Sequence, residues 1–123
     1  MQITMNTQKA QEYFRAKMEF TTGPVELAAM TKNHDNINIV DVRAREDYEK
    51  EHIPGAVNLP RGQWETCSGL SEDVVNVVYC YSQVCHLAAA AALEFSEHGY
   101  PVMELEGGFE GWKEHNFPVE VAS

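Results

Sequence analysis

A cysteine at the start of a short polar segment is the residue in this sequence best suited to covalent chemistry. Cys80 follows the apolar run Val74–Tyr79 and precedes an Ala-rich segment that begins near His86. The run predicts a buried strand, and the Ala-rich segment predicts a helix. Parallel α/β sheets bind ligands beyond the carboxyl ends of their strands, where the next helix N-terminus stabilises negative charge. We therefore expect Cys80 to be a nucleophile with a lowered pKa; a cysteine that only packs in the core is the alternative.

The residues between the predicted strand and helix are the candidates for binding a substrate. Backbone N–H groups of a curled loop can bind an anion, and the hydroxyls of Tyr81 and Ser82 add donors. The segment contains no Lys or Arg, so His86 is its one residue able to become cationic near neutral pH. The predicted substrate-binding residues are Tyr81, Ser82, Gln83, Val84, Cys85 and His86.

Strand and helix patterns alternate along the chain, which predicts an α/β fold with a central, mostly parallel sheet flanked by helices. Strands are expected at Ile37–Val42, Ala56–Leu59, Val74–Tyr79 and Val102–Leu105, with a short edge strand at Met18–Thr21. Helices are expected at Thr7–Lys17, with Tyr13 and Phe14 on an apolar side, at Pro24–Met30, Arg43–Glu51 and His86–Gly99, around Trp112, and as a turn near Trp64.

Length and charge limit the possible functions. A chain of 123 residues predicts a single domain, residues 1–123, in which residues 1–17 form a helical extension and 18–121 the core. The net charge of −10 disfavours binding to nucleic acid or to an anionic membrane. The longest apolar run, Leu87–Leu93, is far shorter than the ~20 residues of a membrane span, and Met1–Gln11 has no apolar signal region.

The cysteine spacing favours a reactive thiol over a metal site or a disulfide framework. Three cysteines, an odd number, suit a reducing cytoplasmic setting. Cys80, Cys85 and His86 crowd into one tight loop without a second ligand pair, which argues against zinc. Their spacing also differs from the Cys-x-x-Cys of thioredoxin-type redox centres. We expect neither a metal nor another cofactor.

Three ordered motifs resemble the signatures of the rhodanese-like domain family. The first is Ile39–Arg43 followed by Tyr48 and His52–Pro60. The second is Tyr79-Cys80 with the Ala-rich helix, and the third is Gly107–Trp112 followed by Pro118-Val119. The resemblance implies a three-layer α/β fold. It also implies that Cys80 accepts a sulfane sulfur as a persulfide and hands it to a thiophilic acceptor.

The resemblance implies small partners for such a reaction. The donor would be thiosulfate, a persulfide or a polysulfide, and the acceptor a thiol, cyanide or a protein. Active loops of the family often carry Arg or Lys to hold thiosulfate, and residues 80–85 have neither, which favours a persulfide, polysulfide or protein donor. The same departure keeps a non-catalytic binding module as the alternative. A phosphatase or arsenate reductase is disfavoured because the loop lacks the arginine that binds a tetrahedral oxyanion.

Two further questions concern the residues around Cys80. Asp41 and Arg43 are expected to support the site: Asp41 could cap the next helix, and Arg43 could pair with Asp41 or a nearby Glu at the base of the loop. Cys85 has two interpretations: a small side chain that packs at the helix start, or a thiol that resolves a Cys80 persulfide by forming a disulfide. His52 is expected to be structural, Trp112 to lie in the core, and Gly107 and Gly108 to allow tight backbone geometry beside the loop.

Overall fold

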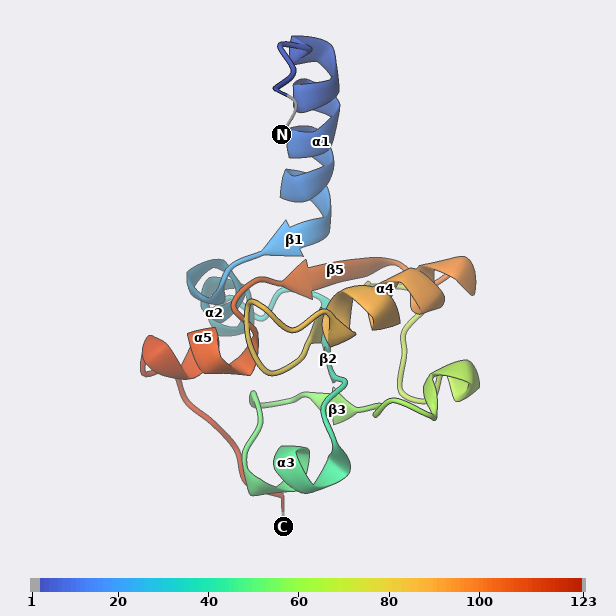
Figure 1. The fold of residues 1–123 in the computed structure, drawn as a ribbon. Helices are drawn as coiled ribbons and strands as arrows, with labels where there is room; N and C mark the ends of the chain where they lie inside the picture. The colour runs from blue at the N-terminus through green and yellow to red at the C-terminus, as the bar shows by residue number, and fades with distance from the viewer. Residues whose placement is uncertain (1–2, 123) are drawn as a thin grey trace.

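The computed structural model describes residues 3–122 and shows an α/β fold built on a parallel sheet. The predicted single domain and polar N-terminal segment also include Met1, Gln2 and Ser123, which lie outside the described residues. Five strands pair in the order β1-β5-β4-β2-β3, and every pair is parallel (Figure 1). The strands are β1 Thr21–Thr22, β2 Ile37–Asp41, β3 Val57–Asn58, β4 Val75–Tyr79 and β5 Val102–Leu105.

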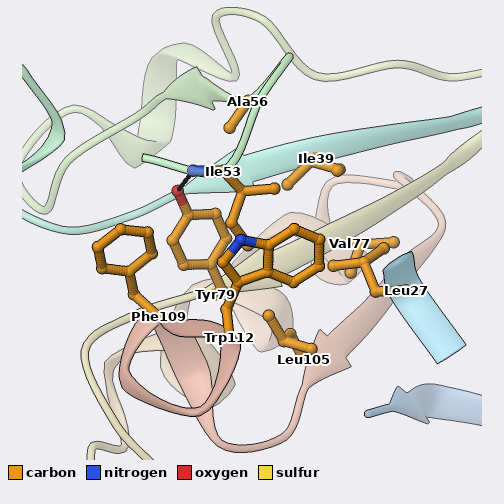
Figure 2. Close-up of a cluster of buried hydrophobic side chains, with 9 residues drawn as sticks. All are labelled: Leu27, Ile39, Ile53, Ala56, Val77, Tyr79, Leu105, Phe109 and Trp112. Atoms are coloured by element: carbon orange, nitrogen blue, oxygen red, sulfur yellow. Dashed lines mark hydrogen bonds between the residues drawn. The ribbon is translucent and has the colours of Figure 1, made fainter. Parts of the chain in front are cut away.

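Helices cover both faces of the sheet, which confirms the predicted fold class. Alternate strand residues point to opposite faces, so Ile39 and Val77 pack with α2 and α5 in one buried cluster (Figure 2). Val40 and Val78 pack with α4 in a second cluster on the other face. The helices are α1 Thr7–Phe20, α2 Pro24–Lys32, α3 Arg45–Lys50, α4 Leu87–Glu97 and α5 Gly108–Glu114, with a 3₁₀ turn at Trp64–Thr66.

The N-terminal helix differs from the prediction in length and in exposure. The edge strand predicted at Met18–Thr21 is wrong in its extent, because α1 continues through Phe20 and β1 contains only Thr21–Thr22. Met and Glu are good helix formers, so α1 continues through them. The strand begins only at the two β-branched threonines. The predicted apolar side of this helix, with Tyr13 and Phe14, is exposed: α1 has no buried side chain and projects from the body of the protein (Figure 1).

Several other elements are shorter than predicted, whereas the helix predicted at Pro24–Met30 continues to Lys32. The helix predicted at Arg43–Glu51 begins at Arg45, because Arg43 is held in the preceding turn by a buried ion pair. Ala44 is its N-cap residue, so Asp41 does not cap this helix. The expected strand at Ala56–Leu59 is limited to Val57–Asn58, and the helix expected at His86–Gly99 is limited to Leu87–Glu97.

Within residues 3–122, no helix has the length and the apolar character that crossing a bilayer requires.

A buried ion pair at the carboxyl end of β2 is hydrogen-bonded to a tyrosine at the end of the neighbouring strand β4. Arg43 Nη2 donates to Asp41 Oδ2 at 2.8 Å, and both side chains are at most 5% exposed. The Tyr79 hydroxyl donates to the same carboxylate at 2.6 Å and accepts the Ile53 N–H at 3.1 Å. Arg43 also donates to the carbonyl of Glu51 at 2.7 Å. Asp41 and Arg43 thus pair in the predicted manner, and they connect β2, β4 and the turn after α3.

The turn around His52 is held in a similar way. Its ring stacks on Tyr48 with centroids 3.9 Å apart, and its Nδ1 lies 2.7 Å from the Tyr48 carbonyl oxygen. The Tyr48 hydroxyl donates to the Ala56 carbonyl at 2.7 Å. His52 therefore has the structural role predicted for it.

We expect Asp41→Ala to destabilise the fold strongly. It leaves the Arg43 guanidinium buried without its counter-ion, a change that costs about 3–5 kcal/mol in comparable buried pairs. Urea unfolding followed by tryptophan fluorescence measures the loss. The matched control is Glu49→Ala, which removes an exposed pair with Arg45 at 3.5 Å and should cost about 0–1 kcal/mol. Similar losses in the two variants would contradict the assignment of Asp41 as a structural centre.

Candidate functional site

Cys80 lies at the carboxyl end of β4, where the chain leaves the sheet and turns toward α4. Its side chain is only 2% exposed and packs with the cluster beneath α4. The Cys85 N–H donates to the Ser82 carbonyl oxygen, and the nitrogen and oxygen are 3.2 Å apart. This turn folds the second half of the loop back toward its start. The loop is therefore curled, as the sequence predicts, and Cys80 is at its base.

The start of α5 holds the first half of this loop in place. The Phe109 N–H donates to the Cys80 carbonyl and the Glu110 N–H to the Tyr81 carbonyl, both at 2.9 Å. The Gly107 N–H donates to Gln83 Oε1 at 2.5 Å. Figure 1 shows the loop beside the start of α5. The segments carrying the second and third predicted motifs thus form one unit.

Gly108 makes this close contact between the two segments possible. Its φ is +60°, and a Cβ placed there would lie 2.7 Å from the Ser82 nitrogen and 2.9 Å from the Cys80 carbonyl oxygen. Both of those atoms belong to the backbone and cannot rotate away. Only glycine fits this position, which confirms the tight geometry expected for Gly107 and Gly108.

Cys80 and Cys85 both pack in the buried cluster beneath α4. Cys80 Sγ also lies 3.5 Å from the Cys85 carbonyl oxygen. Backbone N–H groups point at both sulfurs: those of Ser82 and Ala88 at Cys80, and those of Tyr81 and Leu87 at Cys85. The loop therefore surrounds two sulfur atoms with hydrogen-bond donors, an arrangement that can stabilise a negative charge on sulfur.

The two thiols differ in acidity, and in the opposite sense from the expectation for Cys80. Burial, assisted by the hydrogen bond to Cys85, raises the pKa of Cys80 to about 11, although the N–H groups of Ala88 and Ser82 oppose this. Partial burial would also raise the pKa of Cys85. The hydrogen bond with Cys80 and the N–H groups of Leu87 and Tyr81 outweigh it and lower that pKa. The predicted lowering for Cys80 is wrong because a predicted helix N-terminus does not reveal how deeply the sulfur is buried.

The remaining predicted loop residues have different surroundings. The Tyr81 hydroxyl donates to Asp47 Oδ2 at 2.6 Å and accepts the Ala44 N–H, so it joins the loop to α3 instead of facing the sulfurs. Val84 is 86% exposed at the tip of the loop. His86 is exposed and is the N-cap residue of α4.

Two hollows flank the second half of the loop, from Ser82 to His86, and a third lies beside Tyr81. A groove of about 730 Å³ lies between α1, β5 and α4, and Cys85 and His86 form one end of its lining. A smaller hollow of about 300 Å³ has Ser82, Gln83 and Val84 on one side and Glu110 and Glu114 on the other. Cys80 lines none of the three. Its neighbour Cys85 is therefore the thiol that opens onto a surface groove.

The groove includes residues that sequence reasoning missed. Phe20 and Lys17 reach it from α1, and Glu104 and Glu106 come from β5 and its end. They meet because β1 pairs with β5 in the register Thr21 to Glu104, and because Lys17 Nζ binds Glu106 Oε2 at 2.6 Å. No local motif signals this pairing, which joins residues more than eighty positions apart in the chain.

The part of the chain that the structure describes shows no group of three or more His, Cys, Asp or Glu side chains placed to hold a metal ion.

Both the sequence and the fold of this chain are similar to those of known proteins. The sequence pattern of the rhodanese-like domain matches residues 23–115. Thiosulfate sulfurtransferase GlpE from Coxiella burnetii is 37% identical over 89 residues, which cover 71% of this chain and 80% of GlpE. The HTH-type transcriptional regulator Rv0324 from Mycobacterium tuberculosis is 33% identical over 85 residues, 68% of this chain. The match covers only 38% of that regulator, so the chain corresponds to a part of it.

Solved structures extend the similarity to the N-terminal helix. The crystal structure of the BH2092 protein from Bacillus halodurans has a TM-score of 0.86 and 34% identity, and the match covers 94% of this chain and 87% of that one. The rhodanese-like pattern begins only at residue 23. A match over 94% of the chain must therefore include part of the segment before it.

We expect Gly108→Ala to loosen the contact between α5 and the loop. The new Cβ must displace backbone atoms of Ser82 and Cys80, so the free energy of unfolding should fall by about 2–4 kcal/mol. The amides of Phe109 and Glu110 should then exchange hydrogen faster. Gly55→Ala is the matched control, because its φ is +84° with nothing within 4 Å, and it should cost about 1–2 kcal/mol. Equal losses and unchanged exchange would contradict the crowding at Gly108.

Iodoacetamide should distinguish the two loop thiols. In a Cys67→Ser background at pH 7, we expect Cys85 to be modified more than about tenfold faster than Cys80, because alkylation requires the thiolate. Modification of Cys80 should accelerate as the pH rises toward its pKa of about 11, while that of Cys85 levels off at lower pH. Peptide mapping over time gives both rates. Faster modification of Cys80 at pH 7 would reverse the assignment.

Proposed function

Because the chain belongs to the rhodanese-like domain family, we propose that it is a sulfurtransferase in which Cys80 carries a sulfane sulfur as a persulfide. The observation that carries the proposal is the position of Cys80, at the end of β4 and inside a curled loop whose N–H groups point at its sulfur. A persulfide is an anion near neutral pH, so these donors favour it in the same way as a thiolate.

The reaction we propose has two displacement steps. The Cys80 thiolate attacks the outer sulfur of the donor, and the rest of the donor leaves with the electron pair: sulfite from thiosulfate, or a thiolate from a persulfide. A thiophilic acceptor, such as a thiol, cyanide or a protein thiol, then removes the sulfane sulfur. A reducing compartment such as the cytoplasm suits this chemistry, because it keeps the free thiols reduced.

The surroundings of the loop disfavour thiosulfate as the donor. The hollow beside Ser82 is bordered by Glu110 and Glu114, and Glu104 lies near Cys85. These carboxylates repel a dianion such as thiosulfate, and the loop has no Lys or Arg to compensate. We therefore propose a persulfide, whose terminal sulfur carries at most one negative charge, as a better donor than thiosulfate, with a polysulfide as the second candidate. Residues Tyr81–His86 form the wall that a small donor must pass, since Cys80 itself is buried.

The alternative proposal is a non-catalytic module that binds a partner. The buried Cys80 and the lack of a cation in the loop favour this alternative. The similarity to part of a transcriptional regulator also supports this alternative, because that protein is named as a regulator and not as an enzyme. A module of this kind would bind its partner without accepting sulfur, so one measurement separates the two proposals.

We expect Cys80→Ser to abolish sulfur acceptance. Protein is treated with polysulfide or with thiosulfate, and the sulfur taken up is the sum of the mass gain on the chain and the sulfide released. With Cys85 replaced by Ser in both proteins, so that no second loop thiol takes up sulfur, loss of the nucleophile should lower this sum at least about hundredfold. Cys67→Ser, which changes a thiol outside the loop, should leave it unchanged. Equal acceptance by wild type and Cys80→Ser would exclude Cys80 as the carrier, and none by wild type would favour the binding module.

A further inference from the structure

Cys85 lies directly beside the Cys80 sulfur, and this points to the fate of the bound sulfur. We propose that Cys85 is the acceptor for the Cys80 persulfide: it forms a Cys80–Cys85 disulfide, releases the sulfane sulfur as hydrosulfide, and makes turnover dependent on a dithiol reductant. This inference rests on the proposed function and adds the identity of the acceptor and the form in which sulfur leaves.

Geometry is the first support for this role. Cys80 Sγ lies 3.5 Å from the carbonyl oxygen of Cys85, both cysteines pack in the cluster beneath α4, and the turn between Ser82 and Cys85 folds the loop back toward Cys80. Formation of a disulfide requires Cβ atoms within about 3.5–4.5 Å and correctly directed, and a local adjustment of this short loop supplies that geometry in the proposal. Cys85 therefore reaches the Cys80 sulfur without unfolding the loop.

The reaction balances as a thiol–disulfide exchange. The Cys85 thiolate attacks Cys80 Sγ, the bond between that sulfur and the sulfane sulfur breaks, and the electron pair leaves with hydrosulfide. The sulfane sulfur gains two electrons, and the two cysteine sulfurs together lose two in forming the disulfide. An external dithiol then reduces the disulfide and becomes a disulfide itself.

The leaving group favours attack on the inner sulfur. Attack on the outer sulfur would instead expel the Cys80 thiolate and move the persulfide to Cys85. Exchange is faster when the leaving sulfur is the conjugate base of a stronger acid. Hydrosulfide is a much weaker base than the thiolate of a buried cysteine whose pKa is about 11. Release of hydrosulfide is therefore the faster outcome.

The exposure of the two thiols suits the reductive half of the cycle. Cys80 is 2% exposed, whereas Cys85 is partly exposed and lines the groove between α1, β5 and α4. A dithiol can therefore reach the Cys85 sulfur of the disulfide, and its attack there frees the Cys80 thiol. The buried thiol accepts sulfur, and the accessible one exchanges with the reductant.

The test compares wild type with Cys85→Ser, both in a Cys67→Ser background so that no third thiol interferes. Each protein is exposed briefly to polysulfide, desalted, and followed by intact mass and by sulfide release. We expect wild type to release stoichiometric sulfide and to yield a Cys80–Cys85 peptide pair. We expect Cys85→Ser to retain the Cys80 persulfide about tenfold longer or more. Dithiothreitol should restore continuous sulfide release in wild type and accelerate it far less in the variant.

Three outcomes would overturn the inference. Equal persulfide lifetimes without a Cys80–Cys85 pair would leave Cys85 as a packing residue, with sulfur transfer by Cys80 intact. Transfer of the extra sulfur onto Cys85 without sulfide release would make Cys85 a relay. Failure of Cys85→Ser to take up any sulfur on Cys80 would overturn the proposed function together with this inference.

Discussion

The buried carboxylate of Asp41 is the point on which the rest of the architecture depends. It accepts hydrogen bonds from Arg43 on its own strand end and from Tyr79, the residue directly before Cys80. The Arg43 guanidinium in turn lies 4.2 Å from the centre of the Phe109 ring, at the start of α5. One desolvated charge pair thus connects the two central strands with the helix that holds the loop. Because a buried charge tolerates no loss of its partner, the position of Cys80 is tied to the integrity of this network.

A consequence of this arrangement is that reactivity and access are divided between two cysteines. Packing beneath α4 keeps Cys80 in a fixed place but removes it from solvent and disfavours its thiolate. Cys85 is partly exposed, and its hydrogen bonds favour the thiolate. In most single-thiol sites one residue must be both reactive and accessible. Here the curled loop lets neighbouring residues meet these two demands.

Much of this organisation is readable from the sequence, and the limits have physical reasons. The apolar runs around Val40 and Val77 predict central strands, because a strand that is buried on both faces of the sheet shows no alternation of polar and apolar residues. The sequence predicts that Gly108 is in a tight position. It does not reveal that the atoms it faces are backbone atoms of Ser82 and Cys80. The acidity of Cys80 is missed because burial depends on packing by α4, a tertiary property. The groove is missed because the pairing of Thr21 with Glu104 joins distant segments that share no motif.

The sheet ends on both sides in a strand of only two residues, β1 and β3. An exposed strand edge offers unpaired backbone groups to other chains and so invites intermolecular β-pairing. Strands this short present almost no such template, and β1 also covers the edge of β5, a four-residue strand. The segment that precedes the rhodanese-like pattern therefore covers an edge at which β5 would otherwise offer unpaired backbone groups to another chain.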